Sequence, residues 1–188
     1  MEEIKQEKNL RQKLILVGLK ELEEHGIKDF SLRRVAFSAE VSCAAPYRHF
    51  KNKDELIVAI LEYIKEDWYI LCKQMEQVFN ENYKELIKEI CLSCVKFWIA
   101  NGNFLSVLFL IQSSTNEQIK KVLRDFDKPI LCAIDCYGQK FHVDENSLNL
   151  LKHSLPSLTY GSIMLITKNS SKTEELIISL KNILDNTL

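Results

Sequence analysis

Glycine and proline are scarce in this sequence, whose 188 residues contain five glycines and three prolines. Folds built on β-sheets use both residues repeatedly in their turns, so this scarcity argues against all-β and doubly wound architectures. The composition is 46% hydrophobic and 27% charged, which is enough for a sizeable packed core. Apolar residues return every three or four positions along most of the chain, and this spacing predicts an all-α protein of about nine helices.

Other absences limit the compartment and the chemistry. The chain begins Met-Glu-Glu-Ile-Lys-Gln, without the apolar stretch of a signal peptide. No uncharged apolar run reaches the roughly 18 to 20 residues of a membrane helix, so we expect a cytoplasmic protein without a membrane partner. The signatures H-E-x-x-H and G-x-S-x-G and a glycine-rich phosphate loop are all missing, which argues against an enzyme. We therefore predict no catalytic residue and no cofactor.

The six cysteines are expected to be reduced thiols, because the chain shows no export signal and has an adequate core. Cys91 and Cys94 form a C-x-x-C pair, and Cys132 and Cys136 stand four residues apart. Either pair could bind a metal or act as a redox switch. Both lie in apolar helical periodicity, where cysteine behaves as a small hydrophobic residue, so structural packing is favoured and no metal ligand is predicted. A thiol- or metal-responsive regulator remains an alternative.

Basic charge is concentrated in one segment, although the whole chain has a net charge of -1. From Lys28 to Lys53 there are six basic and two acidic residues, a net charge of +4, so the rest carries -5. A chain with this overall charge is not coated in basic surface for non-specific binding to nucleic acid. The asymmetry instead indicates a single DNA-facing segment.

The same segment has the pattern of a helix-turn-helix. A first helix is expected to end at His25-Gly26, and Ser31 can cap a short second helix that runs to about Ala39. Ser42 can cap a third, very short helix to about Phe50. Two short helices joined by a tight turn, the second basic where it leaves the core, place a recognition helix in the major groove of DNA.

Further helices are expected without an intervening linker. Helical spacing predicts a long helix from Asn52 past Met75, with Glu55 as its capping-box glutamate. Helices are then expected over 82–101, 104–111, 115–138, 144–168 and 171–188, with a kink or restart at Pro129.

The segments Phe30-Ser-Leu-Arg-Arg-Val-Ala, Ala39-Glu-Val-Ser and Ala45-Pro-Tyr-Arg-His-Phe-Lys-Asn-Lys-Asp-Glu-Leu56 resemble the DNA-binding signature of the TetR/AcrR family of transcriptional regulators. The resemblance implies a DNA-binding domain over residues 1–52 and an effector-binding and dimerisation domain over residues 53–188. It also implies a homodimer, joined through its last two helices, that represses transcription at a palindromic operator and is released by a small-molecule inducer. A helical protein-interaction adaptor is the alternative from another class.

The resemblance also assigns roles to residues of the DNA-binding segment. Phosphate contacts fall to Ser31, Arg33, Ser42, Tyr47, His49 and Lys53, and base reading falls to the exposed positions Cys43, Ala44, Ala45 and Arg48. Two residues depart from the common pattern, because Glu40 stands where glycine is usual and Pro46 where leucine is more common. Since proline disfavours helical geometry at the preceding residue, we expect the recognition helix to be distorted at its start.

In proteins of this type the inducer lies among the later helices, and the chain supplies aromatic, amide and thiol groups there. The predicted ligand-binding residues are Trp68, Tyr69, Cys72, Phe97, Trp98, Phe104, Phe109, Gln112 and Tyr137. For any single one of them an ordinary core position remains the alternative. Because Leu86 to Gln112 carries little charge, a small, mainly apolar inducer is expected.

Overall fold

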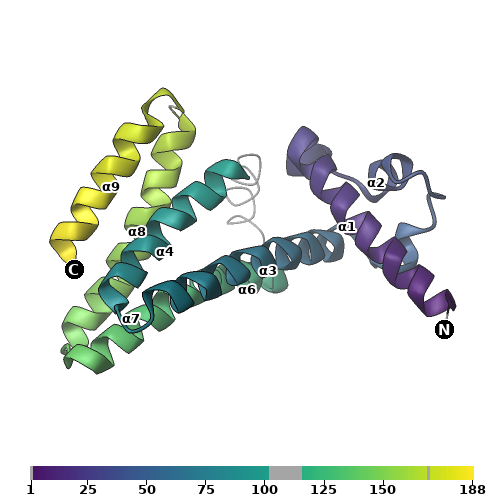
Figure 1. Cartoon of the computed structure of the whole chain (residues 1–188). Helices are drawn as coiled ribbons and strands as arrows, with labels where there is room; N and C mark the ends of the chain where they lie inside the picture. The colour runs from purple at the N-terminus through teal and green to yellow at the C-terminus, as the bar shows by residue number, and fades with distance from the viewer. Residues whose placement is uncertain (1, 102–115, 169) are drawn as a thin grey trace. The chain divides into compact units, whose positions relative to one another are not determined.

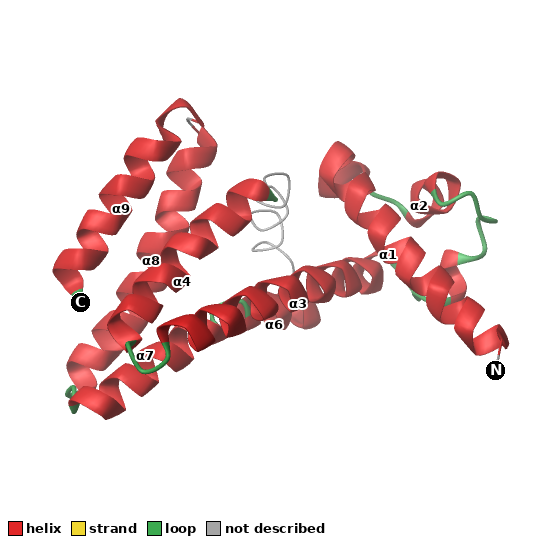
Figure 2. Ribbon diagram, in the orientation of Figure 1, coloured by secondary structure: helices red, strands yellow, loops and turns green. Residues whose placement is uncertain are grey.

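The protein is all-helical in the residues that its computed structural model describes, which are 2–101, 116–168 and 170–188 (Figures 1 and 2). These residues form eight α-helices and two 3-10 helices and no strand, which confirms the predicted fold class. The α-helices are α1 (Glu2–Asp29), α2 (Leu32–Ser38), α3 (Lys53–Phe79), α4 (Tyr83–Ala100), α6 (Glu117–Asp125), α7 (Lys128–Phe141), α8 (Glu145–Lys168) and α9 (Thr173–Thr187). The 3-10 helices are η1 (Pro46–Arg48) and η2 (Ser170–Lys172). The helix expected over 104–111 lies outside the described residues.

The described chain divides into two compact units. The first contains residues 2–66 and 116–124, and the second contains residues 67–101, 125–168 and 170–188. Helix α3 supplies residues to both units. The expected boundary between residues 52 and 53 separates a DNA-binding domain from an effector-binding domain. This functional division stays a prediction. None of the described helices combines the length and the apolar character needed to cross a membrane.

The first unit is organised around the contact of α1 with α2 and with the start of α3. Leu14 and Leu22 of α1 and Leu56 of α3 are fully buried, as are Val35 and Ala36 on the inner face of α2. The helices approach closely at Gly18, where an added Cβ would lie 3.0 Å from Cδ1 of Ile60. The buried residues of α2 thus lie on one face of that helix.

The ends of the first two helices agree with the capping pattern. Gly26 has φ 68° and ψ 175°, so the regular helix ends there as expected. Ser31 is extended, and its hydroxyl accepts a hydrogen bond from the Arg34 amide at 3.2 Å. Glu40 follows α2 with φ 56°, the left-handed conformation that glycine adopts without strain. The departure at Glu40 thus leaves the turn intact at a conformational cost.

The second unit is built around α4, which contacts α7, α8 and α9, while α8 also contacts α7 and α9. The interior contains a chain of aromatic rings with centroids 5.1 to 5.8 Å apart. In order, its members are Trp68, Phe97, Trp98 and Phe126. Pro129 lies in the first turn of α7, where it has no helical hydrogen bond to lose, so the predicted restart is confirmed.

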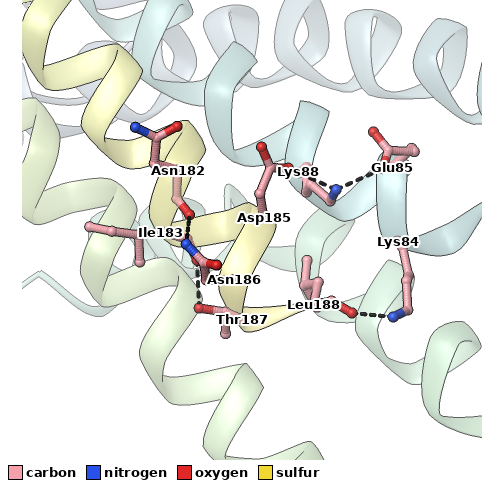
Figure 3. A network of polar contacts seen from close by, with 9 residues as sticks. All are labelled: Lys84, Glu85, Lys88, Asn182, Ile183, Asp185, Asn186, Thr187 and Leu188. Atoms are coloured by element: carbon pink, nitrogen blue, oxygen red, sulfur yellow. Dashed lines mark hydrogen bonds and ion pairs between the residues drawn. The ribbon is translucent and has the colours of Figure 1, made fainter.

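A polar network joins the last turns of α9 to α4 (Figure 3). The ammonium of Lys88 donates to Asp185 at 2.8 Å and to Glu85 at 2.7 Å, and both carboxylates raise the pKa of the lysine. Lys84 donates to the carbonyl oxygen of Leu188. Exposed pairs of this kind are screened by solvent and add little to stability. They supplement the packing of α9 on α4, in which Leu180 and Leu184 are buried.

The backbone at Gly26 predicts opposite effects for two glycine substitutions. Gly26→Ala should lower the free energy of unfolding by about 1–3 kcal/mol, because alanine rarely adopts this backbone conformation. Gly161→Ala should raise it by up to about 1 kcal/mol, because alanine has the higher helix propensity. Gly161 lies inside α8 and has nothing within 4 Å of an added Cβ. Urea unfolding followed by circular dichroism measures both, and shifts of the same sign would contradict the prediction.

Candidate nucleic-acid interface and ligand pocket

The segment between α2 and α3 forms a turn followed by the 3-10 helix η1, so the very short helix expected from Ser42 to about Phe50 is reduced to one 3-10 turn over Pro46–Arg48. The amides of Ala45, Arg48 and His49 bond to carbonyls three residues earlier, at 2.9, 3.2 and 3.0 Å. Pro46 has no amide hydrogen for the carbonyl of Ser42, which prevents an α-helical start. Ala45 itself keeps right-handed helical angles, so the distortion lies in the hydrogen-bond pattern.

This segment turns one side to the core and the other outward. Ala45, Pro46 and Phe50 are buried, which corrects the expectation that Ala45 is an exposed position. His49 is half-buried, with its ring centroid 6.3 Å from that of Phe50. The exposed predicted residues are Ser42, Cys43, Ala44, Tyr47 and Arg48. The short helix therefore presents a phenol and a guanidinium on an outer surface that is otherwise made of small side chains.

The starts of two helices flank this surface. Ser31 and Arg33 begin α2, where Ser31 is half-buried and Arg33 is exposed. At the start of α3 the Asn52 side chain accepts from the Glu55 amide at 2.9 Å, and the Glu55 carboxylate accepts from the Lys51 amide at 2.5 Å. The predicted capping glutamate is therefore confirmed. Lys53 places its ammonium 5.8 Å from the centroid of the Phe30 ring.

A buried carboxylate, which sequence reasoning missed, separates the roles of two adjacent arginines. Glu21 of α1 is 7% exposed and accepts from the Ser38 hydroxyl at 2.5 Å. Its other oxygen lies 3.2 Å from Nε of Arg34, so this partly exposed arginine links α2 to α1 by an ion pair. Arg33 remains exposed. Glu21 follows Leu14 and Gly18 at helical spacing, and this was the available signal that it faces inward.

The structure brings together some of the predicted ligand-binding residues. Trp68, Phe97 and Trp98 belong to the aromatic chain, and Cys72 is buried. Tyr69 instead donates to the carbonyl of Asp125 at 2.6 Å, and Tyr137 packs on Phe141 with ring centroids 5.0 Å apart. Phe104, Phe109 and Gln112 lie outside the described residues.

A small cavity lies among α3, α4, α7 and α8 in the second unit. It offers about 10 Å³ to the centre of a water-sized sphere, which is room for about one water molecule. Its lining residues are Trp68, Ile90, Cys91, Cys94, Phe126, Asp127, Ile130, Pro156, Thr159 and Tyr160. Trp68 is the one predicted ligand-binding residue in this lining. The other lining residues were not predicted as ligand-binding, because the cavity combines residues from distant segments.

Asp127 and Tyr160 are the strongly polar pair of this lining. The Tyr160 hydroxyl donates to Oδ1 of Asp127 at 2.9 Å across 33 residues of sequence. Burial raises the pKa of the Asp127 carboxyl above its ordinary value, although the tyrosine hydrogen bond lowers it. Burial and the nearby carboxylate also raise the pKa of Tyr160, so the phenol keeps its proton.

Cys132 of this unit is exposed and Cys136 is half-buried. Cys72 and Cys91 are buried and Cys94 is half-buried, and burial makes these three thiols less acidic. It raises the pKa of Cys91 to about 11, and it also raises that of Cys94. The pKa of Cys72 is about 12, because burial and the Glu76 carboxylate both disfavour its thiolate. Since the thiolate is the nucleophile and the metal ligand, these values support packing. Within the described residues, no three His, Cys, Asp or Glu side chains gather as a metal site would require.

Residues 14–60 match the model of the family described as bacterial regulatory proteins, tetR family. Over 80 residues the chain is 26% identical to an HTH-type transcriptional regulator of Staphylococcus aureus (strain USA300). That alignment covers 43% of this chain and 43% of the relative, so the chain spans less than half the length of that protein.

Solved structures share the fold over nearly the whole chain. A TetR transcription regulator from Haloarcula marismortui is 16% identical with a TM-score of 0.77, and 96% of each chain is covered. FadR from Bacillus subtilis, solved in complex with stearoyl-CoA, is 17% identical with a TM-score of 0.74, over 94% of this chain and 98% of that one. The multidrug binding protein EbrR, complexed with imidazole, is 15% identical with a TM-score of 0.72, over 96% and 90%.

The raised pKa of Asp127 predicts how its substitution changes stability with pH. The folded state binds this proton more tightly than the unfolded chain, so the carboxylate costs stability as pH rises through its folded pKa. Asp127→Asn keeps an acceptor for Tyr160 without the charge. It should raise the melting temperature at pH 7, and the gain should shrink toward pH 3.

Asp144→Asn is the matched control. Hydrogen bonds from Ser147 lower the pKa of the Asp144 carboxyl, so its charge stabilises the folded state above the unfolded pKa. This variant should lower the melting temperature at pH 7, and the difference should disappear in acid. Calorimetry from pH 3 to pH 7 measures both proteins, and a lower melting temperature for Asp127→Asn at pH 7 would refute the prediction.

Proposed function

We propose that this chain, which belongs to the TetR family of bacterial regulatory proteins, is a repressor that binds a palindromic operator as a homodimer and releases it when a small molecule binds. The observation that carries the proposal is the surface of η1, where Tyr47 and Arg48 are exposed while Pro46 and Phe50 anchor the segment in the core. A two-fold dimer would contact half-sites about 34 Å apart, or a multiple of that distance.

Most of the proposed contacts position the protein without reading sequence. Ser31, Arg33, Ser42, Tyr47, His49 and Lys53 supply hydroxyl, phenol, imidazole and cationic groups, which suit phosphate oxygens. Their positions at the starts of α2 and α3 and around η1 support a common role. Phosphate contacts also make binding salt-dependent, and this property separates a DNA-binding protein from an adaptor that contacts other proteins.

Base reading is proposed for the exposed residues of the turn and of η1. Cys43 and Ala44 have short side chains that can approach thymine methyl groups closely. Arg48 is the long hydrogen-bond donor of this set, and arginine reads guanine through two hydrogen bonds. The burial of Ala45 removes it from the proposed base contacts.

Dimerisation is proposed through α8 and α9. Both helices carry large apolar side chains on their outer surfaces, among them Leu150 (68% exposed), Leu165 (54%), Ile178 (59%) and Ile183 (45%). A contact with the same helices of a second copy would remove this apolar surface from water, in the four-helix arrangement common in helical dimers.

The inducer is proposed to enter the second unit and to be small and mainly apolar. The aromatic chain and the apolar majority of the cavity lining support this assignment. FadR and EbrR share the fold and were solved with stearoyl-CoA and with imidazole. Because these two ligands differ so much, the fold does not determine the ligand. The side chains of this chain therefore have to indicate the chemistry of its inducer.

Substitution of Arg48 tests whether the protein recognises the base sequence of its operator. Arg48→Ala should weaken operator binding by about 1–3 kcal/mol and relax the preference at one base pair in each half-site. Tyr47→Phe should weaken binding to all sequences alike, because a phosphate contact carries no base information. Both proteins are compared with the wild type on a randomised operator library at fixed salt. If Arg48→Ala leaves the base preference unchanged, Arg48 contacts the backbone and the proposed reading is wrong.

The dimer is tested by placing charge on α8 and α9. In sedimentation at micromolar concentration the wild type should have twice the 21.9 kDa mass of one chain. Leu165→Glu combined with Ile178→Glu should raise the dimer dissociation constant at least about tenfold, because a buried unpaired charge opposes association. Val78→Glu is the control, since Val78 is 76% exposed on α3. A monomeric wild type, or an equal effect of the control, would reject this interface.

A further inference from the structure

We propose that the cavity lined by Asp127 and Tyr160 holds a primary ammonium group at one end of an otherwise apolar inducer. This inference rests on the proposed function, since it identifies the chemical class of the molecule that the second unit would sense. It is argued from the hydrogen-bonding capacity that remains in the lining, from charge and from size.

The strong donors around the cavity are already engaged. Nε1 of Trp68 donates to the carbonyl of Phe126 at 3.1 Å. The Thr159 hydroxyl donates to the Leu155 carbonyl of its own helix at 2.8 Å, and the Tyr160 hydroxyl donates to Asp127 at 2.9 Å. The thiols of Cys91 and Cys94 stay protonated and are weak donors. A ligand that needs to accept strong hydrogen bonds would have to displace one of these existing bonds.

Acceptor capacity remains on the acid. A carboxylate has about four lone-pair sites, and Tyr160 occupies one of those on Asp127. Asp127 has no ion-pair partner within the described residues, and the neighbouring Lys128 pairs with Asp125 at 2.8 Å. An incoming cation would therefore meet an acid that has one hydrogen bond and no counter-ion, in surroundings where charge interactions are stronger than in water.

The remaining walls suit a cation with an apolar tail. Trp68 and Phe126 line the same cavity, and aromatic faces attract cations in addition to the acid. Ile90, Ile130 and Pro156 complete an apolar lining that suits the carbon atom attached to the ammonium. A carboxylate or a phosphate at this position would face a negative charge and find its donors already engaged.

Size narrows the class further. The space is enough for about one water molecule, and a primary ammonium is of similar size. A trimethylammonium group is much larger and has no N–H to donate. The expected ligand is therefore an aliphatic or aromatic primary amine whose apolar part extends beyond the cavity.

The test uses four molecules with the same eight-carbon chain: octylamine, 1-octanol, octanoate and octyltrimethylammonium. Their binding to DNA-free wild-type protein is measured by isothermal titration calorimetry at pH 7. Octylamine should bind at least about tenfold more tightly than each of the others, because it alone combines positive charge with N–H donors. Octanoate or octyltrimethylammonium binding as tightly as octylamine, or no binding of any of the four, would overturn the proposal.

Two variants test whether the preference for octylamine over 1-octanol arises from Asp127 in this cavity. Asp127→Asn should reduce the preference for octylamine over 1-octanol to within about threefold, because the charge is lost while an acceptor remains. Tyr160→Phe should keep the preference, since it removes a donor and leaves the carboxylate. An undiminished preference in Asp127→Asn would place the amine elsewhere and reject this site.

The experiment separates this inference from the proposed function. Octylamine selectivity is measured without DNA, and operator binding is measured without octylamine. A protein that selects octylamine but binds no duplex DNA would refute the repressor and leave the amine site standing. A protein that binds the operator but prefers octanoate to octylamine would refute the amine site and leave the repressor standing.

Discussion

The hydrogen bonds that Trp68 and Tyr69 donate to the carbonyls of Phe126 and Asp125 are the interaction on which the cavity of the second unit depends. Carbonyls at the end of a helix have no partner within that helix, and burial without one is costly. Two adjacent side chains of α3 supply the partners here, so α6 can end inside the protein. Helix α7 then restarts, with Pro129 in its first turn. The break places Asp127 against Tyr160, and the cavity forms beside this pair.

Buried polar groups also decide which side chains the DNA-binding unit presents. Glu21 of α1 pairs with Arg34 of α2, and its contact with Ser38 adds a second link between the two helices. Arg33, the adjacent residue, remains exposed at the start of α2. The proline of η1 has a comparable effect, because it replaces a regular helix by a 3-10 turn that buries Ala45 and exposes Tyr47 and Arg48. Small departures from regular structure thus determine the composition of the proposed DNA surface.

Sequence reasoning succeeded where the signal was local. The cap at Ser31, the helix end at Gly26, the capping glutamate Glu55 and the restart at Pro129 all depend on residues within a few positions of one another. It was less successful for the third helix, where a distorted start was expected at Pro46 but the segment forms only a turn and a 3-10 helix. The family resemblance supplied the roles of the DNA-facing residues, which periodicity alone does not contain.

By itself the sequence determined the fold class, most helix boundaries and the position of the basic segment, because helical periodicity, capping and local charge depend on residues that are close together in the chain. Only the tertiary structure decided which polar groups meet. The hydrogen bond of Asp127 with Tyr160 crosses 33 residues, and the contact of Glu21 with Ser38 crosses 17. Pairings of this kind depend on how helices pack and rotate against one another, and many sequences with the same periodicity would pack differently. The chemistry of the cavity lined by Asp127 and Tyr160 is therefore a property of the packed helices.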